Sequence, residues 1–196
     1  MLCWGDLISG YLTSTGFFGR LLSRPFHLLE KRCWQQADIV IGVSRTFVDL
    51  LVKEGLPAEK TSIVPEVVDA ELFNPMVDGT LIRQRYKLDS CAVVMTHGLL
   101  AHYKRIDVFI EAASIVHQMR GDVKFLVVGG GPSLRELLDL VQAKKAEEYI
   151  FFTGWVNFAE MPRYIAASDI GVVCRGGSTA NEMVITQALL QYWACG

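Results

Sequence analysis

Short apolar runs and segments of helical period alternate along most of the chain. Residues 125–128 are apolar and partly β-branched, and three glycines and a proline follow at 129–132. Apolar positions then recur at the spacing of a helix face, at Leu134, Leu137 and Val141. Because such runs indicate buried strands and glycine marks turns, this pattern predicts a strand, a tight turn and a helix.

Elements of this kind repeat from about residue 90 to the last residue of the sequence. Strands that alternate with helices at this spacing favour one parallel, Rossmann-like sheet with right-handed crossovers and helices on both faces. The predicted strands are 92–96, 123–128, 149–153 and 170–174, and the predicted helices are about 104–119, 133–146 and 160–168, with a last helix that starts near Asn181.

Each predicted strand of this sheet is followed by glycine at its carboxyl end. Ligands bind outside the carboxyl ends of the strands in open parallel sheets, and a helix N-terminus beside such a turn favours phosphate. The pattern therefore predicts a ligand site at this edge, although the closing of a strand–helix turn would by itself explain the glycines at 129–131. The four glycine-containing ends are 97–98, 129–131, 154–155 and 175–178.

The first part of the chain predicts a separate α/β element over residues 37–65. An apolar run at 37–44 is typical of a buried parallel strand, and Ser44 is placed to cap the helix that follows it. A second strand is predicted at 61–64, and the turn-rich residues 66–80 have the composition of a linker.

Composition restricts the class of protein. The chain of 196 residues is 51% hydrophobic and 20% charged, with a net charge of −2 and a pI near 6.1, and it has no basic run. This balance disfavours a nucleic-acid-binding protein. No apolar run has the length of a membrane span, the start of the chain lacks the basic lead of a signal peptide, and the five cysteines show no metal-site spacing. We therefore expect a cytoplasmic protein with reduced, mostly buried thiols.

Residues 17–29 combine a helical pattern with many large apolar residues and the basic residues Arg20 and Arg24. A helix packed on its own domain is the favoured explanation. The alternative is a helix that lies on a membrane surface, which would place the protein peripherally at the inner membrane face.

Several motifs follow one another in an order that resembles the family 4 glycosyltransferases. This resemblance implies a retaining, nucleotide-sugar-dependent enzyme of hexosyl type with the GT-B fold. The motifs are the segment 37–44, the segment 63–75 with its Asn-Pro, the segment from His97-Gly98 to Lys104, the segment 127–132, the segment 152–156 and the final Ala194-Cys195-Gly196.

The resemblance also implies a division of the chain. Enzymes of this fold have two Rossmann-like domains, so residues 1–75 are expected to be the end of the acceptor-side domain and the linker. Residues 76–196 are expected to be a truncated nucleotide-sugar donor domain. The chain would then be a fragment that is inactive alone.

For the donor diphosphate, the resemblance implies a role for Lys104, which follows the first loop of the donor domain. The family commonly has an arginine directly after the glycine of this loop, whereas Leu99 stands here after Gly98. The adjacent Arg105 could supply the missing charge. Cations at a phosphate stabilise the leaving group without a metal ion, so we expect a metal-independent reaction.

The family pattern also has two glutamates eight positions apart before its closing Ala-x-Gly. Here Gln191 stands at the second position and Met183 at the first, while Glu182 is one residue early. Glu182 is therefore the predicted catalytic carboxylate at the donor sugar, and Gln191 can still hydrogen-bond ribose hydroxyls. The predicted donor-binding residues are Gly98, Lys104, Arg105, Gly130, Gly131, Trp155, Thr186 and Gln191, with no metal ligand.

Other readings of the same residues remain open. The departures at Leu99 and Gln191 are compatible with a non-catalytic domain that binds a nucleotide or a glycan. The turn at 129–131 resembles a dinucleotide-binding fingerprint, but Leu134 stands where its third glycine belongs. The predicted donor is a UDP- or GDP-sugar, no other cofactor is expected, and the acceptor is a glycan, a lipid or a small molecule.

Overall fold

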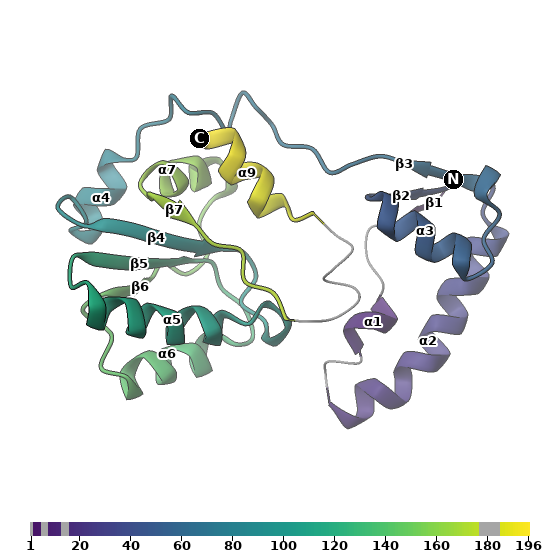
Figure 1. The fold of residues 1–196 in the computed structure, drawn as a ribbon, viewed down its shortest axis with the longest axis horizontal. Coiled ribbons are helices and arrows are strands. Elements are labelled where there is room, and N and C mark those ends of the chain that lie inside the picture. The colour runs from purple at the N-terminus through teal and green to yellow at the C-terminus, as the bar shows by residue number, and fades with distance from the viewer. Residues whose placement is uncertain (1, 5–7, 13–15, 177–184) are drawn as a thin grey trace. The chain divides into compact units, whose positions relative to one another are not determined.

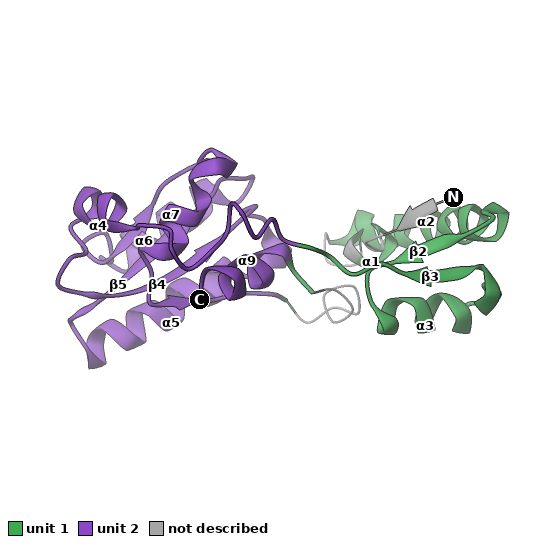
Figure 2. Ribbon diagram, turned by 90° about the horizontal axis from the view of Figure 1, so that it is seen from above, with its two compact units in different colours: residues 1–67, 176–186 green, residues 68–175, 187–196 purple. Residues whose placement is uncertain are grey.

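The computed structural model describes residues 2–4, 8–12, 16–176 and 185–196. Contacts divide the chain into two compact units, which Figure 2 shows in green and purple. Unit 1 is residues 1–67 with 176–186, and unit 2 is residues 68–175 with 187–196. The segment 68–75 thus belongs to unit 2 by its contacts. The predicted domains 1–75 and 76–196 stay a prediction.

Unit 2 is built on a four-stranded parallel sheet of order β6-β5-β4-β7. Its first two strands pair from Ala92 opposite Val123 to His97 opposite Val128, which confirms the predicted parallel neighbours. β7 is shorter than predicted, although the Val172 N–H still donates to the Met95 carbonyl at 2.7 Å. The strands are β4 (Ala92–His97), β5 (Val123–Val128), β6 (Ile150–Phe152) and β7 (Ile170–Gly171).

Side chains of β5 alternate between two cores, as a strand buried on both faces requires. Val123, Phe125 and Val127 lie in one core, and Leu126 and Val128 lie in the other. Figure 1 shows helices on both faces of the sheet, as predicted. The first core is covered by α5 (Ile106–Met119) and α6 (Leu134–Ala143), and the second by α4 (Thr80–Tyr86), α7 (Met161–Ala166) and α9 (Gln187–Cys195).

The turn-rich segment before α4 is fixed to unit 2. Phe73 is only 1% exposed and lies in the second core. The Asp69 carboxylate accepts from the Glu71 N–H at 3.0 Å, and the Asp78 carboxylate accepts from the Thr80 N–H at 2.9 Å. These local bonds are the turn chemistry that the composition of the segment predicts.

The last described helix, α9, begins at Gln187, after Ile185 and Thr186, which lie in no helix or strand. The predicted helix start near Asn181 lies outside the described residues. The start of α5 differs from the prediction. α5 begins at Ile106 because Arg105 has a left-handed backbone, with φ 52°. Lys104 ends the short 3-10 turn η2 (His102–Lys104), so neither basic residue lies within α5.

Unit 1 holds a second parallel sheet of order β1-β2-β3. Its core is formed by Trp34, Val40, Phe47, Leu51 and Leu56. The Ser44 hydroxyl accepts from the Phe47 N–H at 3.1 Å, so the predicted helix cap is confirmed. The elements are β1 (Leu2–Trp4), α1 (Ile8–Leu12), α2 (Phe17–Gln36), β2 (Val40–Gly42), α3 (Arg45–Lys53), η1 (Ala58–Lys60) and β3 (Thr61–Ile63).

α2 packs on its own unit through Gly19, Glu30 and Trp34, as favoured from the sequence. Apolar side chains of its first half are nevertheless exposed, with Phe17 and Phe18 each 77% exposed. Cys33 is also exposed, so the described thiols are less buried than predicted. Within the described ranges, no helix combines the length and the apolarity that crossing a membrane requires.

Candidate functional site

The carboxyl ends of the four strands of unit 2 meet at one edge of the sheet. From β4 the chain runs to β5 and then β6 on one side, and it returns to place β7 on the other side of β4. The gap between the ends of β4 and β7 is therefore the topological switch point, where open parallel sheets form their binding crevice. His97 ends β4 and Gly171 ends β7.

The loops after β4 and β5 are bonded to each other at this edge. The Gly98 N–H donates to the Val128 carbonyl at 2.9 Å, and the Leu100 N–H donates to the Gly130 carbonyl at 2.9 Å. The Ser133 N–H returns a bond to the Leu100 carbonyl at 3.0 Å. These three bonds hold the predicted donor residues Gly98 and Gly130 on one rigid double loop.

Glycine is required in the double loop for packing. Gly129 has φ 137°, and a Cβ placed there would lie 2.0 Å from the Gly98 carbonyl oxygen. Gly131 has φ 155°, and its Cβ would lie 2.5 Å from the Leu100 carbonyl oxygen. Loop packing thus accounts for both glycines. Gly98 also has a positive φ, of 122°, but no atom lies within 4 Å of the position of a Cβ, so a ligand can approach its backbone.

Trp155 lies over the turn that follows β5. A Cβ on Gly130 would come within 2.6 Å of the indole Nε1 of Trp155, so the indole rests on the backbone of Gly130. The Trp155 side chain is nevertheless 69% exposed. A large aromatic ring is therefore presented to solvent at the carboxyl edge.

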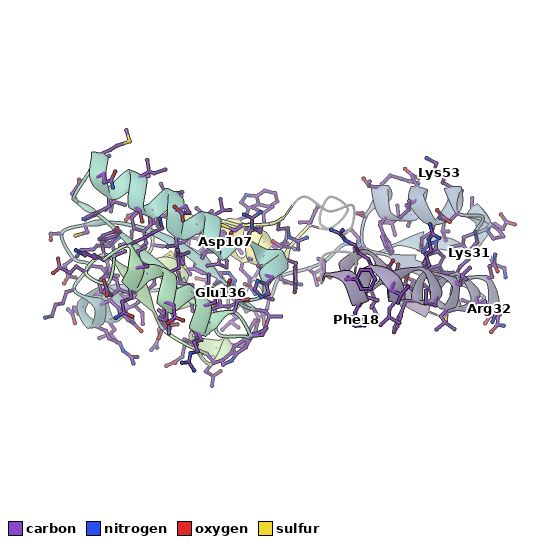
Figure 3. All side chains as sticks on the ribbon, turned by 90° about the horizontal axis from the view of Figure 1, so that it is seen from below. Phe18, Lys31, Arg32, Lys53, Asp107 and Glu136 are labelled. Carbon is purple, nitrogen blue, oxygen red and sulfur yellow. The ribbon has the colours of Figure 1, made fainter. Side chains whose placement is uncertain are left out.

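The two basic residues after the first loop have different surroundings. The Arg105 guanidinium forms an ion pair with Asp107 at 2.9 Å, and this partner lowers the pKa of the Asp107 carboxyl. Figure 3 shows Asp107 at the start of α5. The ammonium of Lys104 lies 5.5 Å from the centre of the Tyr103 ring. Arg105 is thus engaged with Asp107 within its own turn, whereas Lys104 lies beside the ring of Tyr103.

His97 is partly buried at the switch point. Burial, followed by the positive charge of Lys104, lowers its pKa to about 4, so its imidazole is neutral near pH 7. Its ring meets the Tyr192 ring edge to face at 5.1 Å. His97 Nε2 and the Tyr192 hydroxyl are both buried and have no hydrogen-bond partner among the described residues.

α9 closes the switch point from one face of the sheet. The Tyr192 ring lies against Gly171, where a Cβ would come within 2.6 Å of the ring, and burial raises the pKa of the Tyr192 hydroxyl. Gln191, the residue predicted to bind ribose, is only 5% exposed. Sequence reasoning did not identify Tyr192, because its partner Gly171 lies far away along the chain.

The described structure brings part of the predicted site together. Gly98, Lys104, Gly130, Gly131 and Trp155 belong to the segments that follow β4, β5 and β6. Thr186 belongs to unit 1, and the predicted carboxylate Glu182 lies outside the described residues. Among the residues described, no cluster of three His, Cys, Asp or Glu side chains could hold a metal ion.

The comparisons with known proteins identify the family. The family model described as glycosyl transferases group 1 matches residues 91–196, which is more than half of the chain. The protein belongs to this family. The match begins at the first strand of the unit 2 sheet, so it covers the strands and loops of the candidate site.

Curated relatives are longer than this chain. An amylovoran biosynthesis glycosyltransferase of Erwinia amylovora is 26% identical over 93% of this chain and 44% of its own length. The alpha-D-kanosaminyltransferase of Streptomyces kanamyceticus is 28% identical over 84% of this chain and 44% of its own length. The chain thus spans less than half the length of these relatives.

Solved structures confirm the GT-B fold. Anabaena HepE in complex with UDP-glucose covers 99% of this chain with a TM-score of 0.79 at 19% identity, and 51% of HepE is matched. WaaG, a glycosyltransferase involved in lipopolysaccharide biosynthesis, covers 98% with a TM-score of 0.75 at 17% identity, and 54% of WaaG is matched. At these identities the likeness establishes the fold alone.

Proposed function

We propose that the protein transfers a sugar from a nucleotide-sugar donor to an acceptor, with retention of the anomeric configuration. The observation that carries this proposal is the family match over residues 91–196, which covers the carboxyl edge with Gly98 and Lys104. The donor is a UDP- or GDP-linked hexose.

In the proposed mechanism, the donor diphosphate lies at the double loop. The open backbone of Gly98 lets a phosphate come close, and Lys104 opposes the charge that develops on the diphosphate as the glycosidic bond breaks. Such charge-assisted contacts act where negative charge increases in the transition state, and they do this work without a metal ion.

The other predicted residues take the remaining parts of the donor. We assign the backbone of Gly130 and Gly131 to the diphosphate and the backbone of Trp155 to the nucleobase, as the resemblance to the family implies. Gln191 is assigned to the ribose and Glu182 to the donor sugar, and Thr186 stays among the proposed donor-binding residues without a more specific role. Arg105 stays in the proposed set, with the condition that it must leave Asp107 to reach a phosphate.

A non-catalytic nucleotide-binding domain is the second candidate. It is favoured by Leu99, which is an exposed apolar residue after Gly98, and by the ion pair that occupies Arg105. A dehydrogenase domain is less well supported, because packing between loops accounts for the glycines at 129 and 131.

Isothermal titration with UDP, GDP and NAD separates these candidates. A glycosyltransferase donor site is expected to bind UDP or GDP and to leave NAD unbound. Addition of EDTA is expected to leave the affinity unchanged if no metal ion takes part. Binding of NAD alone would refute the proposal, and binding of UDP without turnover in any longer form of the protein would favour the non-catalytic candidate.

A further inference from the structure

The outer face of α2 in unit 1 is apolar and exposed. Gly19, Glu30 and Trp34 form the buried face of the helix, which turns toward the core of unit 1. At 100° per residue, five large apolar side chains lie on the opposite half of the circumference, whereas Phe26 lies within 40° of Glu30. We define the outer face of α2 by Phe17 and Phe18 (77% exposed each), Leu21 (64%), Leu28 (62%) and Leu29 (55%).

Exposed charges on the same helix are basic. Arg20, Arg24 and Arg32 are exposed, and within the described residues Arg24 and Arg32 take part in no ion pair. Lys31 pairs with Glu54 at 3.6 Å on the side of α2 that faces α3, whereas Arg32 points to the opposite side in Figure 3.

The only acidic residue of α2 adds no charge to the exposed surface. Glu30 is 4% exposed, and its carboxylate accepts hydrogen bonds from the Ser9 hydroxyl and from the Ser9 N–H. The accessible side of α2 therefore carries large apolar residues between arginines and presents no carboxylate.

We propose that the outer face of α2 docks on the surface of an anionic phospholipid membrane, with the helix axis in the plane of the interface. Aromatic and leucine side chains on one face and arginines beside them are the features of helices that lie at the headgroup level. Apolar side chains enter the boundary of the acyl chains, while the flexible arginine side chains reach the lipid phosphates.

Charge favours a lipid surface over a second copy of this chain. In a two-fold symmetric pair, the same face of each protomer meets its counterpart, so the arginines of one α2 would approach those of the other. Like charges that face each other destabilise an interface. A bilayer with anionic headgroups instead offers acyl chains for the apolar side chains and, directly above them, negative charge for the arginines.

Vesicle sedimentation with the purified chain tests this proposal. The chain is expected to sediment with vesicles of phosphatidylcholine that contain about one third phosphatidylglycerol, and to stay largely in solution with phosphatidylcholine alone. Binding is expected to weaken as salt is raised, because the lipid charge is screened. Equal binding to both vesicle types, or to neither, would overturn the proposal.

Paired variants separate the apolar and the basic contributions. Leu21→Glu is expected to lower the partition coefficient at least about tenfold, while Ile115→Glu on α5, at a position of similar exposure, is expected to leave it unchanged. Arg24→Gln combined with Arg32→Gln is expected to lower binding to anionic vesicles about 30-fold, with Arg135→Gln as the control for loss of one surface charge. Equal effects of the test and control variants would refute the assignment to α2.

Two further measurements keep these outcomes distinct. Circular dichroism of Leu21→Glu should match that of the unmodified chain, since the side chain is exposed. Light scattering without vesicles should give a monomer. A dimer that Leu21→Glu dissociates would mean that a second copy covers this face. UDP affinity should be the same in all variants, so failure here is separable from failure of the proposed donor site.

Discussion

At the residue scale, Lys104 is the side chain on which the proposed donor site depends most. Arg105 is held by Asp107, and Leu99 carries no charge, so Lys104 is the cation that we propose to oppose the diphosphate. We expect Lys104→Ala to weaken binding of a nucleoside diphosphate by about 1.5 to 3 kcal/mol, the range for a hydrogen bond to a charged group. Calorimetry with UDP and GDP measures this directly.

A matched control distinguishes a contact from a general effect of charge. Lys53, in the last turn of α3, is an exposed lysine of unit 1, and Lys53→Ala removes the same charge away from the strands of unit 2. The affinity of the Lys53→Ala variant for UDP and GDP should equal that of the unmodified protein. If both variants bind alike, Lys104 has no place in the diphosphate site.

His97 gives the protein a pH-dependent stability. Its pKa is about 4 when folded and near 6.5 in an unfolded chain, so between these values the unfolded state binds more protons. Stability contributed by neutral His97 is therefore present above pH 6.5 and is lost as the pH falls toward 4. From pH 7 to pH 4.5 we expect the free energy of unfolding to fall by about 2 to 3 kcal/mol through this residue.

Urea unfolding of the chain and of His97→Gln isolates this contribution from that of the carboxylates. The variant keeps a polar side chain but has no imidazole to protonate. Its loss of stability on acidification should be smaller by the stated amount. Parallel curves for the two proteins would show that His97 is not the group responsible.

At the element scale, the double loop after β4 and β5 is the part of the site whose geometry is most constrained. Gly129→Ala would place a methyl group 2.0 Å from the Gly98 carbonyl oxygen at φ 137°. We expect it to destabilise unit 2 by about 2 kcal/mol or more, through strain and the opening of the loops.

Gly121→Ala is the matched control for this change. Gly121 precedes β5, has no positive φ, and has open space where a Cβ would lie. Thermal unfolding should place this variant close to the unmodified protein and Gly129→Ala well below it. Comparable melting temperatures for the two variants would mean that the loops after β4 and β5 can move apart without loss of stability.

Strands with continuous apolar runs were predicted well, and features that depend on distant partners were not. β4 and β5 follow from their runs of apolar residues, and the Ser44 cap follows from local chemistry. The left-handed backbone of Arg105 has no sequence signal, because glycine is the residue that marks such positions. The contact of Tyr192 with His97 depends on the path of the chain across the switch point.

For the candidate site, glycine spacing predicted that the four glycine-containing ends share one edge of the sheet, but not the role of each glycine. Packing against the loop after β4 and leaving room for a ligand both require glycine. The sequence alone therefore could not indicate that Gly129 and Gly131 are needed for the packing. Lys104 and Trp155 were placed by resemblance to the family. The structure adds what the resemblance lacked, namely the engagement of Arg105 and the burial of Gln191.

At the scale of the whole molecule, donor binding and sugar transfer are expected to separate. The chain spans 44% of the length of its relative from Erwinia amylovora, and the double loop with Lys104 belongs entirely to unit 2. Transfer requires donor and acceptor to be held together, so that a bimolecular step becomes effectively unimolecular. We therefore expect the 196-residue chain to bind UDP or GDP and to show no transfer beyond trace hydrolysis of the donor.

Calorimetry and a radiolabelled donor assay on the same preparation test this separation. Binding without transfer is the expected result, and Lys104→Ala should abolish the trace hydrolysis together with much of the binding, because one cation serves both. Transfer to an acceptor at the turnover of a typical enzyme, about 10 per second, would show that these residues already hold both substrates. Absence of nucleotide binding would instead place the donor-binding determinants outside the double loop.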